Sequence, residues 1–180
     1  MKNIYSMKLF ILLLFFEIVF VSCKMNSTKY TASENKQFSE NLVKANKGLV
    51  KKDHDSISDY VNNNNWDMKK TETGLWYEIV KEGRGRQAKK GLVAHLRYNV
   101  KLINGKECYN SDSLGIKSFK IGQGGVETGL EEGVLLLREG SMARFILPPY
   151  LAYGLLGDEN KIPPRSIIVY NVEMIKLTDY

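Results

Sequence analysis

The strongest constraint on the fold is a run of alternating residues that ends in an Asn-Gly dipeptide. Every second residue from 96 to 102 is apolar: Leu96, Tyr98, Val100 and Leu102. A strand of this kind presents one apolar face to a core and one polar face to water. Asn104-Gly105 follows, and this dipeptide readily supplies the two positive φ angles of a tight turn. The sequence therefore predicts an antiparallel hairpin that reverses at Asn104-Gly105.

Short strands elsewhere extend this hairpin into a sheet. Four further ranges alternate or are rich in β-branched and aromatic residues and are bounded by turn residues. They are residues 75–81, 119–121, 141–147 and 167–177. Since few helical segments interrupt these ranges, the fold class that we predict is α+β with an antiparallel sheet.

One short helix is predicted to begin near Gly129. Thr128 and Glu131 fit a capping box, in which the Thr hydroxyl accepts from an early helix amide and the Glu side chain reaches back to the cap. Three apolar residues then share one helix face: Leu130, Val134 and Leu137. Gly140 is the expected stop of the helix.

The first 22 residues have the composition of a signal for export. Their apolar run from Leu9 to Val21 is shorter than the about 20 residues that span a bilayer, and Glu17 interrupts it. Phe20-Val21-Ser22-Cys23 resembles the lipobox of bacterial lipoproteins, in which the cysteine receives lipid and becomes the mature N-terminus. We therefore expect a lipoprotein signal peptide over residues 1–22 and lipidation of Cys23. The alternative is ordinary cleavage without lipid.

The segment that follows is predicted to hold the main domain at a distance. Residues 23–36 are polar and lack apolar periodicity, as in a flexible tether. Residues 37–66 predict a helical extension of two helices, the first weakened by Gly48, and the asparagines at 62–65 end it. The extension serves either as a spacer or as a surface for dimerisation or partner binding.

Composition and charge exclude several classes of protein. With 43% hydrophobic and 26% charged residues, the composition implies neither a disordered chain nor a membrane protein with several spans. The net charge of +6 is scattered among acidic residues, so no nucleic-acid partner is expected. His54 and His95 have no accompanying ligands, which predicts no metal site. Cys108 is left as a lone thiol if Cys23 carries lipid, and a packing role is expected for it.

The segment from Pro148 to Ser166 is longer than most connections, and long loops often carry function. In this segment and directly after it stand Pro149-Tyr150-Leu151-Ala152-Tyr153-Gly154, Gly157, Ile162-Pro163-Pro164 and Ile168-Val169-Tyr170-Asn171-Val172-Glu173. A further motif, Gly129-Leu130-Glu131-Glu132-Gly133, stands at the start of the predicted helix. Together they resemble the signature of FKBP-type peptidyl-prolyl cis-trans isomerases. The resemblance implies that residues 69–180 form an FKBP-like domain, a twisted antiparallel sheet wrapped around one short helix and preceded by the helical extension.

The resemblance also implies an activity and a site. A domain of this family accelerates cis/trans conversion of peptide bonds that precede proline in polypeptide substrates, and it uses no cofactor. Tyr153 is the expected catalytic residue, because the matching hydroxyl donates to the substrate carbonyl. The expected substrate-binding residues are Tyr98, Cys108, Tyr109, Val126, Glu127, Leu130, Ile162 and Tyr170.

Some of these positions depart from the family pattern. Many members have Phe-Asp where this chain has Cys108-Tyr109, Trp where it has Leu130, and Ile where it has Glu127. Loss of the Asp removes a polar group near the substrate, and Leu in place of Trp enlarges the floor of the pocket. Weak activity is therefore expected.

A narrower resemblance concerns the extension and the start of the domain. Asn46 to Val50, Lys52-Asp53, Trp66 and Thr73 to Tyr77 look like the gliding-motility-associated lipoprotein branch of the family. This implies a lipid-anchored protein of the bacterial cell envelope, facing the periplasm or the outer surface, that assists folding of exported proteins. Motility or secretion machinery is then an expected partner. The alternatives are a catalytically weak holdase chaperone and a structural lipoprotein of such an assembly.

Overall fold

The computed structural model describes residues 32–179, so the predicted signal peptide and Cys23 lie outside the described residues. The elements follow in the order α2 (Ala32–Asn63), β1 (Lys69–Lys70), β2 (Trp76–Lys81), β3 (Val93–Leu102), β4 (Glu107–Asn110), α3 (Ser111–Leu114), β5 (Lys117–Lys120), α4 (Thr128–Val134), β6 (Met142–Leu147), the 3-10 helix η1 (Pro149–Leu151) and β7 (Ile168–Thr178). None of the helices between residues 32 and 179 combines the length and apolar character needed to span a bilayer.

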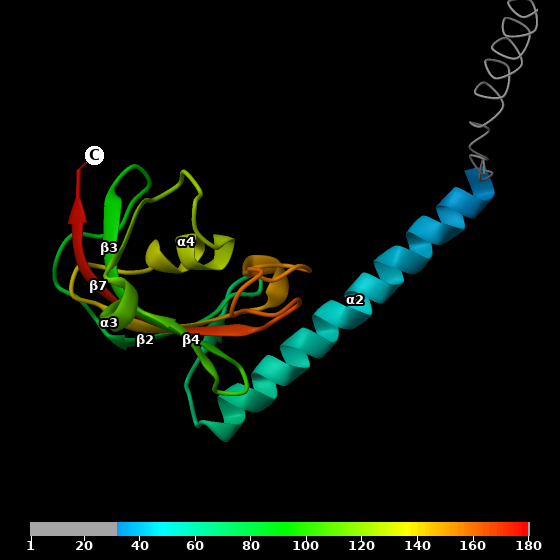
Figure 1. The fold of residues 1–180 in the computed structure, drawn as a ribbon, viewed down its shortest axis with the longest axis horizontal. Helices are drawn as coiled ribbons and strands as arrows, with labels where there is room; N and C mark the ends of the chain where they lie inside the picture. Colours follow the sequence, from blue (N-terminus) through cyan, green and yellow to red (C-terminus); the bar gives the residue numbers. More distant parts are fainter. Residues whose placement is uncertain (1–31, 180) are drawn as a thin grey trace, which may run out of the picture. The chain divides into compact units, whose positions relative to one another are not determined.

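The strands form one antiparallel sheet of the predicted α+β class. Its order is β1-β2-β6-β7-β3-β4, and β5 also pairs with β3. The longest ladder joins β3 to β7, from Val93 opposite Thr178 to Leu102 opposite Ile168. This ladder brings the hairpin strand of the middle of the chain beside the last strand (Figure 1).

The hairpin at Asn104-Gly105 is confirmed, but its turn differs from the expected one. Strands β3 and β4 pair on either side of it. Only Gly105 has a positive φ, of 88°. The Asn104 side chain instead accepts a hydrogen bond of 3.0 Å from the Lys106 amide. The turn itself is closed by two backbone hydrogen bonds of 2.9 Å, from the Gly105 amide to the Leu102 carbonyl and from the Leu102 amide to the Lys106 carbonyl. Only Gly105 therefore takes the left-handed conformation.

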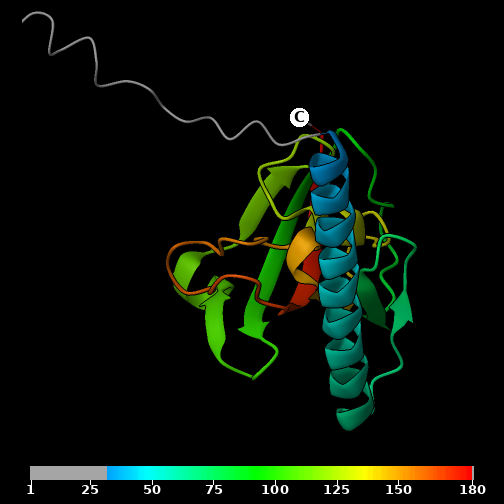
Figure 2. The ribbon, with the colours of Figure 1, turned by 90° about the vertical axis from the view of Figure 1, so that its right-hand side faces the viewer.

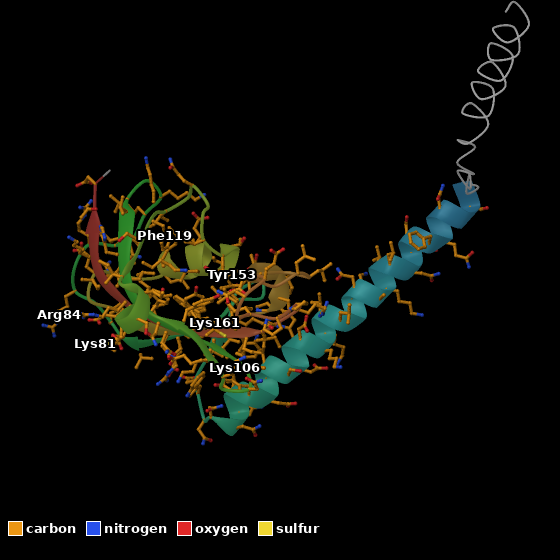
Figure 3. All side chains as sticks on the ribbon, viewed as in Figure 1. Lys81, Arg84, Lys106, Phe119, Tyr153 and Lys161 are labelled. Atoms are coloured by element: carbon orange, nitrogen blue, oxygen red, sulfur yellow. The ribbon has the colours of Figure 1, made fainter. Side chains whose placement is uncertain are left out.

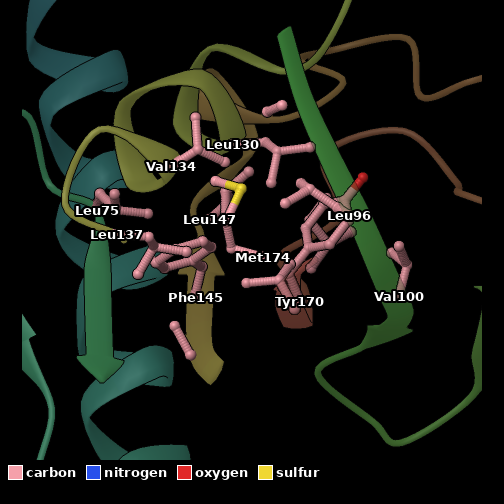
Figure 4. Packing of buried hydrophobic residues seen from close by; sticks show 14 of the residues in the cluster. Leu75, Leu96, Val100, Leu130, Val134, Leu137, Phe145, Leu147, Tyr170 and Met174 are labelled. Carbon is pink, nitrogen blue, oxygen red and sulfur yellow. The ribbon is translucent and has the colours of Figure 1, made fainter. Parts of the chain in front are cut away.

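Helix α4 lies on the concave side of the sheet (Figure 1), and its apolar face closes the core. Leu130 and Val134 face Phe145, Met174 and Tyr170 (Figure 4), and all five side chains are fully buried. The sequence predicted this face correctly. The helix is shorter than expected, since it ends at Val134 and not near Gly140.

Two glycines let α4 approach strand β6 closely. A methyl group at Gly133 would lie 2.8 Å from ring carbons of Phe145, and one at Gly129 would lie 2.6 Å from Leu147 Cγ. Real contacts of this kind are longer, so a side chain at either position would push the helix away from the sheet.

The predicted capping box does not form. The N-cap of α4 is Glu127, and no side chain caps the helix by a hydrogen bond. The Glu131 carboxylate instead accepts from the amides of Gly122 and Gly124, at 2.8 and 3.1 Å. Glu131 thereby stabilises the glycine turn that leads into α4. Its carboxylate is then not available to accept from the amide at the N-cap.

A single helix, α2, replaces the two helices that the sequence predicts. It begins at Ala32, inside the segment predicted to be a tether, and continues through Gly48. Gly48 has open space around it, and an isolated helical glycine costs only about 1 kcal/mol, which a long helix tolerates. The extension of residues 37–66 is therefore helical over most of its length.

The chain divides into two units, residues 1–43 and 44–180. In the first unit the structure describes only the start of α2, where Phe38, Leu42 and Val43 are exposed.

In the second unit, the C-terminal end of strand β6 is buried on both of its faces. Phe145 and Leu147 belong to the core under α4. Ile146 belongs to a second cluster with Ile57 and Val61 of α2. The C-terminal half of α2 is thus packed on the opposite face of the sheet.

Candidate functional site

A pocket of about 280 Å³ opens between the turn before α4 and the segment after η1. Its lining residues come from three parts of the chain: Lys117, Gly125, Val126, Glu127, Ala152 and Tyr153. Tyr153 lies in the interior of the domain near α4, whereas Lys81 and Arg84 lie at its outer edge (Figure 3). Val126, Ala152 and Tyr153 also pack on the main core, which closes the bottom of the pocket.

Two tyrosine hydroxyls converge on one carboxylate in this pocket. Tyr153 Oη donates a short hydrogen bond to Glu127 Oε1. Tyr170 Oη donates to the same oxygen at 2.7 Å. Glu127 is only 7% exposed, so its charge depends on these two donors for the hydrogen bonds that water would otherwise provide.

Lys117 is the cation of the pocket, and the sequence analysis missed it. Its Nζ lies 3.7 Å from Glu127 Oε2 and 3.3 Å from the Tyr170 hydroxyl. It also stands over the rings of Tyr98 and Tyr170, at 5.2 and 5.7 Å from their centroids. A signal was present, because Lys117 is two residues before the buried Phe119 on the same strand and so shares its inward face.

The environment of the pocket keeps its phenols neutral. Burial raises the pKa of Tyr153, and the hydrogen bond to Glu127 raises it further. Burial and the Glu127 charge likewise raise the pKa of Tyr170 and, to a smaller extent, that of Tyr98. Since a neutral phenol is a hydrogen-bond donor, Tyr153 keeps the form that can donate to a substrate carbonyl.

The Asp158 carboxylate stabilises the loop that follows η1 through three hydrogen bonds. This loop runs beside β4 (Figure 2), and Tyr109 Oη of β4 donates a short hydrogen bond to Asp158 Oδ2. Asp158 Oδ1 accepts from the amides of Asn160 and Ile162, at 3.0 and 2.8 Å. Burial raises the pKa of Asp158, but these three hydrogen bonds outweigh it and leave the pKa below its ordinary value. Sequence reasoning did not single out Asp158.

The predicted site residues thus separate into three groups. Around the pocket the structure brings together Tyr98, Val126, Glu127, Tyr153 and Tyr170. Tyr109 instead joins the loop contact with Asp158. The remaining side chains are buried in the core beneath: Cys108, Leu130 and Ile162.

Cys108 has the packing position that was expected for it. The thiol is buried, and its Sγ lies 3.6 Å from the Lys161 carbonyl oxygen. Burial raises the pKa of the thiol, which lowers its reactivity as a nucleophile. Within residues 32–179, no group of three or more His, Cys, Asp and Glu side chains could hold a metal ion.

A larger pocket, of about 500 Å³, lies between α2 and the same loop. Its lining residues are Asn46, Val50, Asp53, Pro149, Tyr150, Gly154, Leu155 and Arg165. Asp53 of α2 pairs with Arg165 of the loop, and the Tyr150 hydroxyl lies 3.1 Å from His54 Nε2. Helix α2 therefore supports the loop that carries Tyr153.

Comparison with known protein families gives a match over residues 84–175, to the model described as FKBP-type peptidyl-prolyl cis-trans isomerase. Among curated proteins, the isomerase FkpA of Escherichia coli K12 is 37% identical over 109 residues, which cover 60% of this chain and 39% of that protein. Peptidyl-prolyl cis-trans isomerase FKBP1A of Xenopus laevis is 37% identical over 107 residues, 58% of this chain and 98% of that protein.

Solved structures of related proteins have the same fold. FkpA from Escherichia coli superposes with a TM-score of 0.60 at 28% identity, over 84% of this chain and 75% of that chain. AtFKBP13 superposes with a TM-score of 0.59 at 30% identity, over 61% of this chain and 98% of that chain. The predicted FKBP-like fold is therefore confirmed. The match spans well under half the length of the first curated relatives, 40% and 39%.

Proposed function

Because the chain belongs to the FKBP-type peptidyl-prolyl cis-trans isomerase family, we propose that its 280 Å³ pocket catalyses cis/trans isomerisation of peptide bonds that precede proline. The observation that carries the proposal is the position of Tyr153. Tyr153 lines the pocket, and its phenol is held in the neutral form that can donate to a carbonyl oxygen.

The chemistry of the reaction fits a pocket of this kind. The barrier to rotation of a peptide bond is about 18 to 20 kcal/mol, because resonance keeps the amide planar. A twisted amide has less charge separation than a planar one, so partial removal from water favours the transition state. A hydroxyl that positions the carbonyl adds to this effect without forming a covalent bond. Val126 and Ala152 supply the apolar wall, and Tyr153 supplies the donor.

The experiment is an isomerisation assay with the purified chain from residue 24 and the short peptide Ala-Leu-Pro-Phe, which carries a C-terminal 4-nitroanilide as its chromophore. We expect acceleration by the wild type and a loss of about tenfold in kcat/KM in Tyr153→Phe, which corresponds to one neutral hydrogen bond of about 1.4 kcal/mol. Tyr60→Phe is the matched control, because Tyr60 packs against Trp66 in the second cluster, away from the pocket. Equal rates with and without wild-type protein would refute the proposal.

The cellular setting is part of the same proposal. The signal-like residues 1–22 and the lipobox-like Phe20-Val21-Ser22-Cys23 support a lipid anchor at Cys23 in the bacterial envelope. The substrates would then be exported proteins, and the residues near Asn46 and Thr73 support a place in the gliding-motility-associated branch, with motility or secretion machinery as a partner. Labelling cells with a fatty-acid analogue tests the anchor, since label should enter the wild type and be absent from Cys23→Ala.

One observation favours a second candidate function, a catalytically weak holdase chaperone. The Tyr153 hydroxyl already donates to Glu127, which limits its use in catalysis. A holdase would suppress aggregation of an unfolded client protein at stoichiometric concentrations. Suppression that persists in Tyr153→Phe, together with no acceleration of the peptide, would favour this function over the isomerase.

A further inference from the structure

The donor that isomerisation requires is already engaged in the free protein. A phenol carries one proton, and that of Tyr153 is directed at Glu127 Oε1. A substrate carbonyl that takes this donor must therefore break the bond between Tyr153 and Glu127. Tyr170 does not offer a substitute, because its own proton is donated to the same oxygen.

The other carboxylate oxygen is poorly satisfied. Glu127 Oε2 is buried and has no hydrogen-bond partner in the described part of the chain. Lys117 Nζ, at 3.7 Å, is too far away for a hydrogen bond but close enough for attraction between the charges. The Lys117 side chain is 25% exposed, against 4% for that of Glu127, so the lysine has more freedom to move.

We propose that Glu127 and Lys117 together control access to the Tyr153 hydroxyl, and we call this pair the gate. Glu127 accepts the hydrogen bond of this hydroxyl until a substrate carbonyl takes its place as acceptor, and Lys117 Nζ then moves to within hydrogen-bond distance of Glu127 Oε2. Both steps presuppose that Tyr153 serves prolyl isomerisation. The ammonium replaces the donor that the buried carboxylate gives up, so the charge is not left with Tyr170 alone. Glu127 is in this way a positioning residue that acts through Tyr153.

The gate makes substrate binding weaker than the pocket would otherwise allow. Glu127→Leu keeps the approximate volume and frees the hydroxyl. We expect a gain of about tenfold in kcat/KM and in affinity for the peptide, the lower end of what a hydrogen bond to a charged group contributes. Glu127→Gln, which keeps an accepting oxygen but no charge, should give a smaller gain.

Lys117 gives the sharper test, because its expected effect depends on Glu127. Lys117→Met should lower kcat/KM in the wild-type background, since the carboxylate then has no replacement donor. In the Glu127→Leu background the same change should have little effect. Matched controls are the exposed Glu72→Leu and Lys89→Met, which remove the same charges away from the pocket.

The measurements are the isomerisation assay and calorimetric titration with Ala-Leu-Pro-Phe, on variants whose thermal unfolding shows a folded protein. The gain in Glu127→Leu should vanish when Tyr153→Phe is added. If Tyr153→Phe slows the reaction but Glu127→Leu or Glu127→Gln brings no gain, the gate is refuted and the isomerase proposal stands. If no variant catalyses, affinity decides: tighter binding that depends on Tyr153 supports the gate, and unchanged binding overturns it.

Discussion

Asp53 on helix α2 holds Arg165 of the loop that carries Tyr153: one guanidinium nitrogen donates to both carboxylate oxygens, at 3.0 and 2.8 Å. The backbone amide of Arg165 donates to the carbonyl of Gly154 at 3.0 Å, next to Tyr153. Arg165 has a φ of 55°, an uncommon value for a residue with a side chain. The ion pair therefore stabilises a loop conformation that its own backbone does not favour.

Asp53→Asn is expected to destabilise the protein by about 2 kcal/mol, because a hydrogen-bonded charge in a largely buried pair is lost. The side chains of Asp53 and Arg165 are 13% and 29% exposed. Isomerase activity should fall more than that of Tyr60→Phe, since the loop loosens. Urea unfolding and the peptide assay check the two effects.

The same helix offers a control for this prediction. Asp55 pairs with Lys51 at 2.6 Å, but both side chains are mostly exposed. Asp55→Asn should change stability by less than about 0.5 kcal/mol. If Asp53→Asn and Asp55→Asn lowered the free energy of unfolding equally, the Asp53–Arg165 pair would not stabilise the loop more than an exposed ion pair does.

The Asp158 contact predicts a dependence of stability on pH. Its folded pKa lies below the ordinary value of 3.8. The carboxylate therefore contributes stability that is complete above that value and is lost as the pH falls through the lower folded pKa. Asp158→Asn should cost about 1 to 2 kcal/mol at pH 7, and this difference should shrink below pH 4. Urea unfolding at pH 7, 5 and 3 measures it.

Two variants separate the Asp158 contact from general acid effects. Tyr109→Phe removes one donor, so the Asp158 pKa measured by NMR should rise toward its ordinary value. Glu159→Gln removes an exposed carboxylate from the same loop and serves as the matched control. If the difference in free energy of unfolding between the wild type and Asp158→Asn stayed constant down to pH 3, Asp158 would not be the source of the pH dependence.

Glycine-to-alanine changes in helices α4 and α2 should shift the free energy of unfolding in opposite directions. Gly133→Ala places a methyl group 2.8 Å from the Phe145 ring, and overpacking should destabilise the protein by about 1 to 3 kcal/mol. Gly48→Ala in α2 meets nothing within 4 Å and should stabilise by about 0.5 to 1 kcal/mol through helix propensity. Thermal unfolding of both variants checks the signs, and stabilisation by Gly133→Ala would be inconsistent with the close contact.

The raised pKa of Tyr153 predicts that this phenol does not ionise with ordinary tyrosines near pH 10. Its contribution to stability is complete below that pH and is lost as the pH rises through the raised folded value. In the native protein, ultraviolet titration of the wild type and of Tyr153→Phe should show the same number of ionising tyrosines near pH 10. In urea, where the pocket is absent, the variant should show one fewer. A difference between the native proteins would refute the prediction.

The sequence alone determined the framework of the fold, because its signals are local. Alternation from Leu96 to Leu102 places one face on the core whatever lies opposite, and Gly105 can adopt a positive φ that other residues avoid. The apolar face of α4 follows from helical spacing in the same way. The prediction of a capping box was wrong, because the Glu131 carboxylate accepts hydrogen bonds from the turn at Gly122 and Gly124. Residue spacing within the helix does not reveal such distant donors.

The candidate site was determined in two stages. The motif around Tyr153 identified the loop and the residues near the pocket, since the order of residues carries the family signature. Only the tertiary structure decided how those residues interact. Glu127, Lys117 and Tyr170 come from three separate elements, and the Asp53 partner of Arg165 lies 112 positions away along the chain. Hydrogen bonds and ion pairs depend on distances of a few ångströms. Those distances are set by the packing of β5, α4 and β7 around the pocket and of α2 against the loop that holds Arg165.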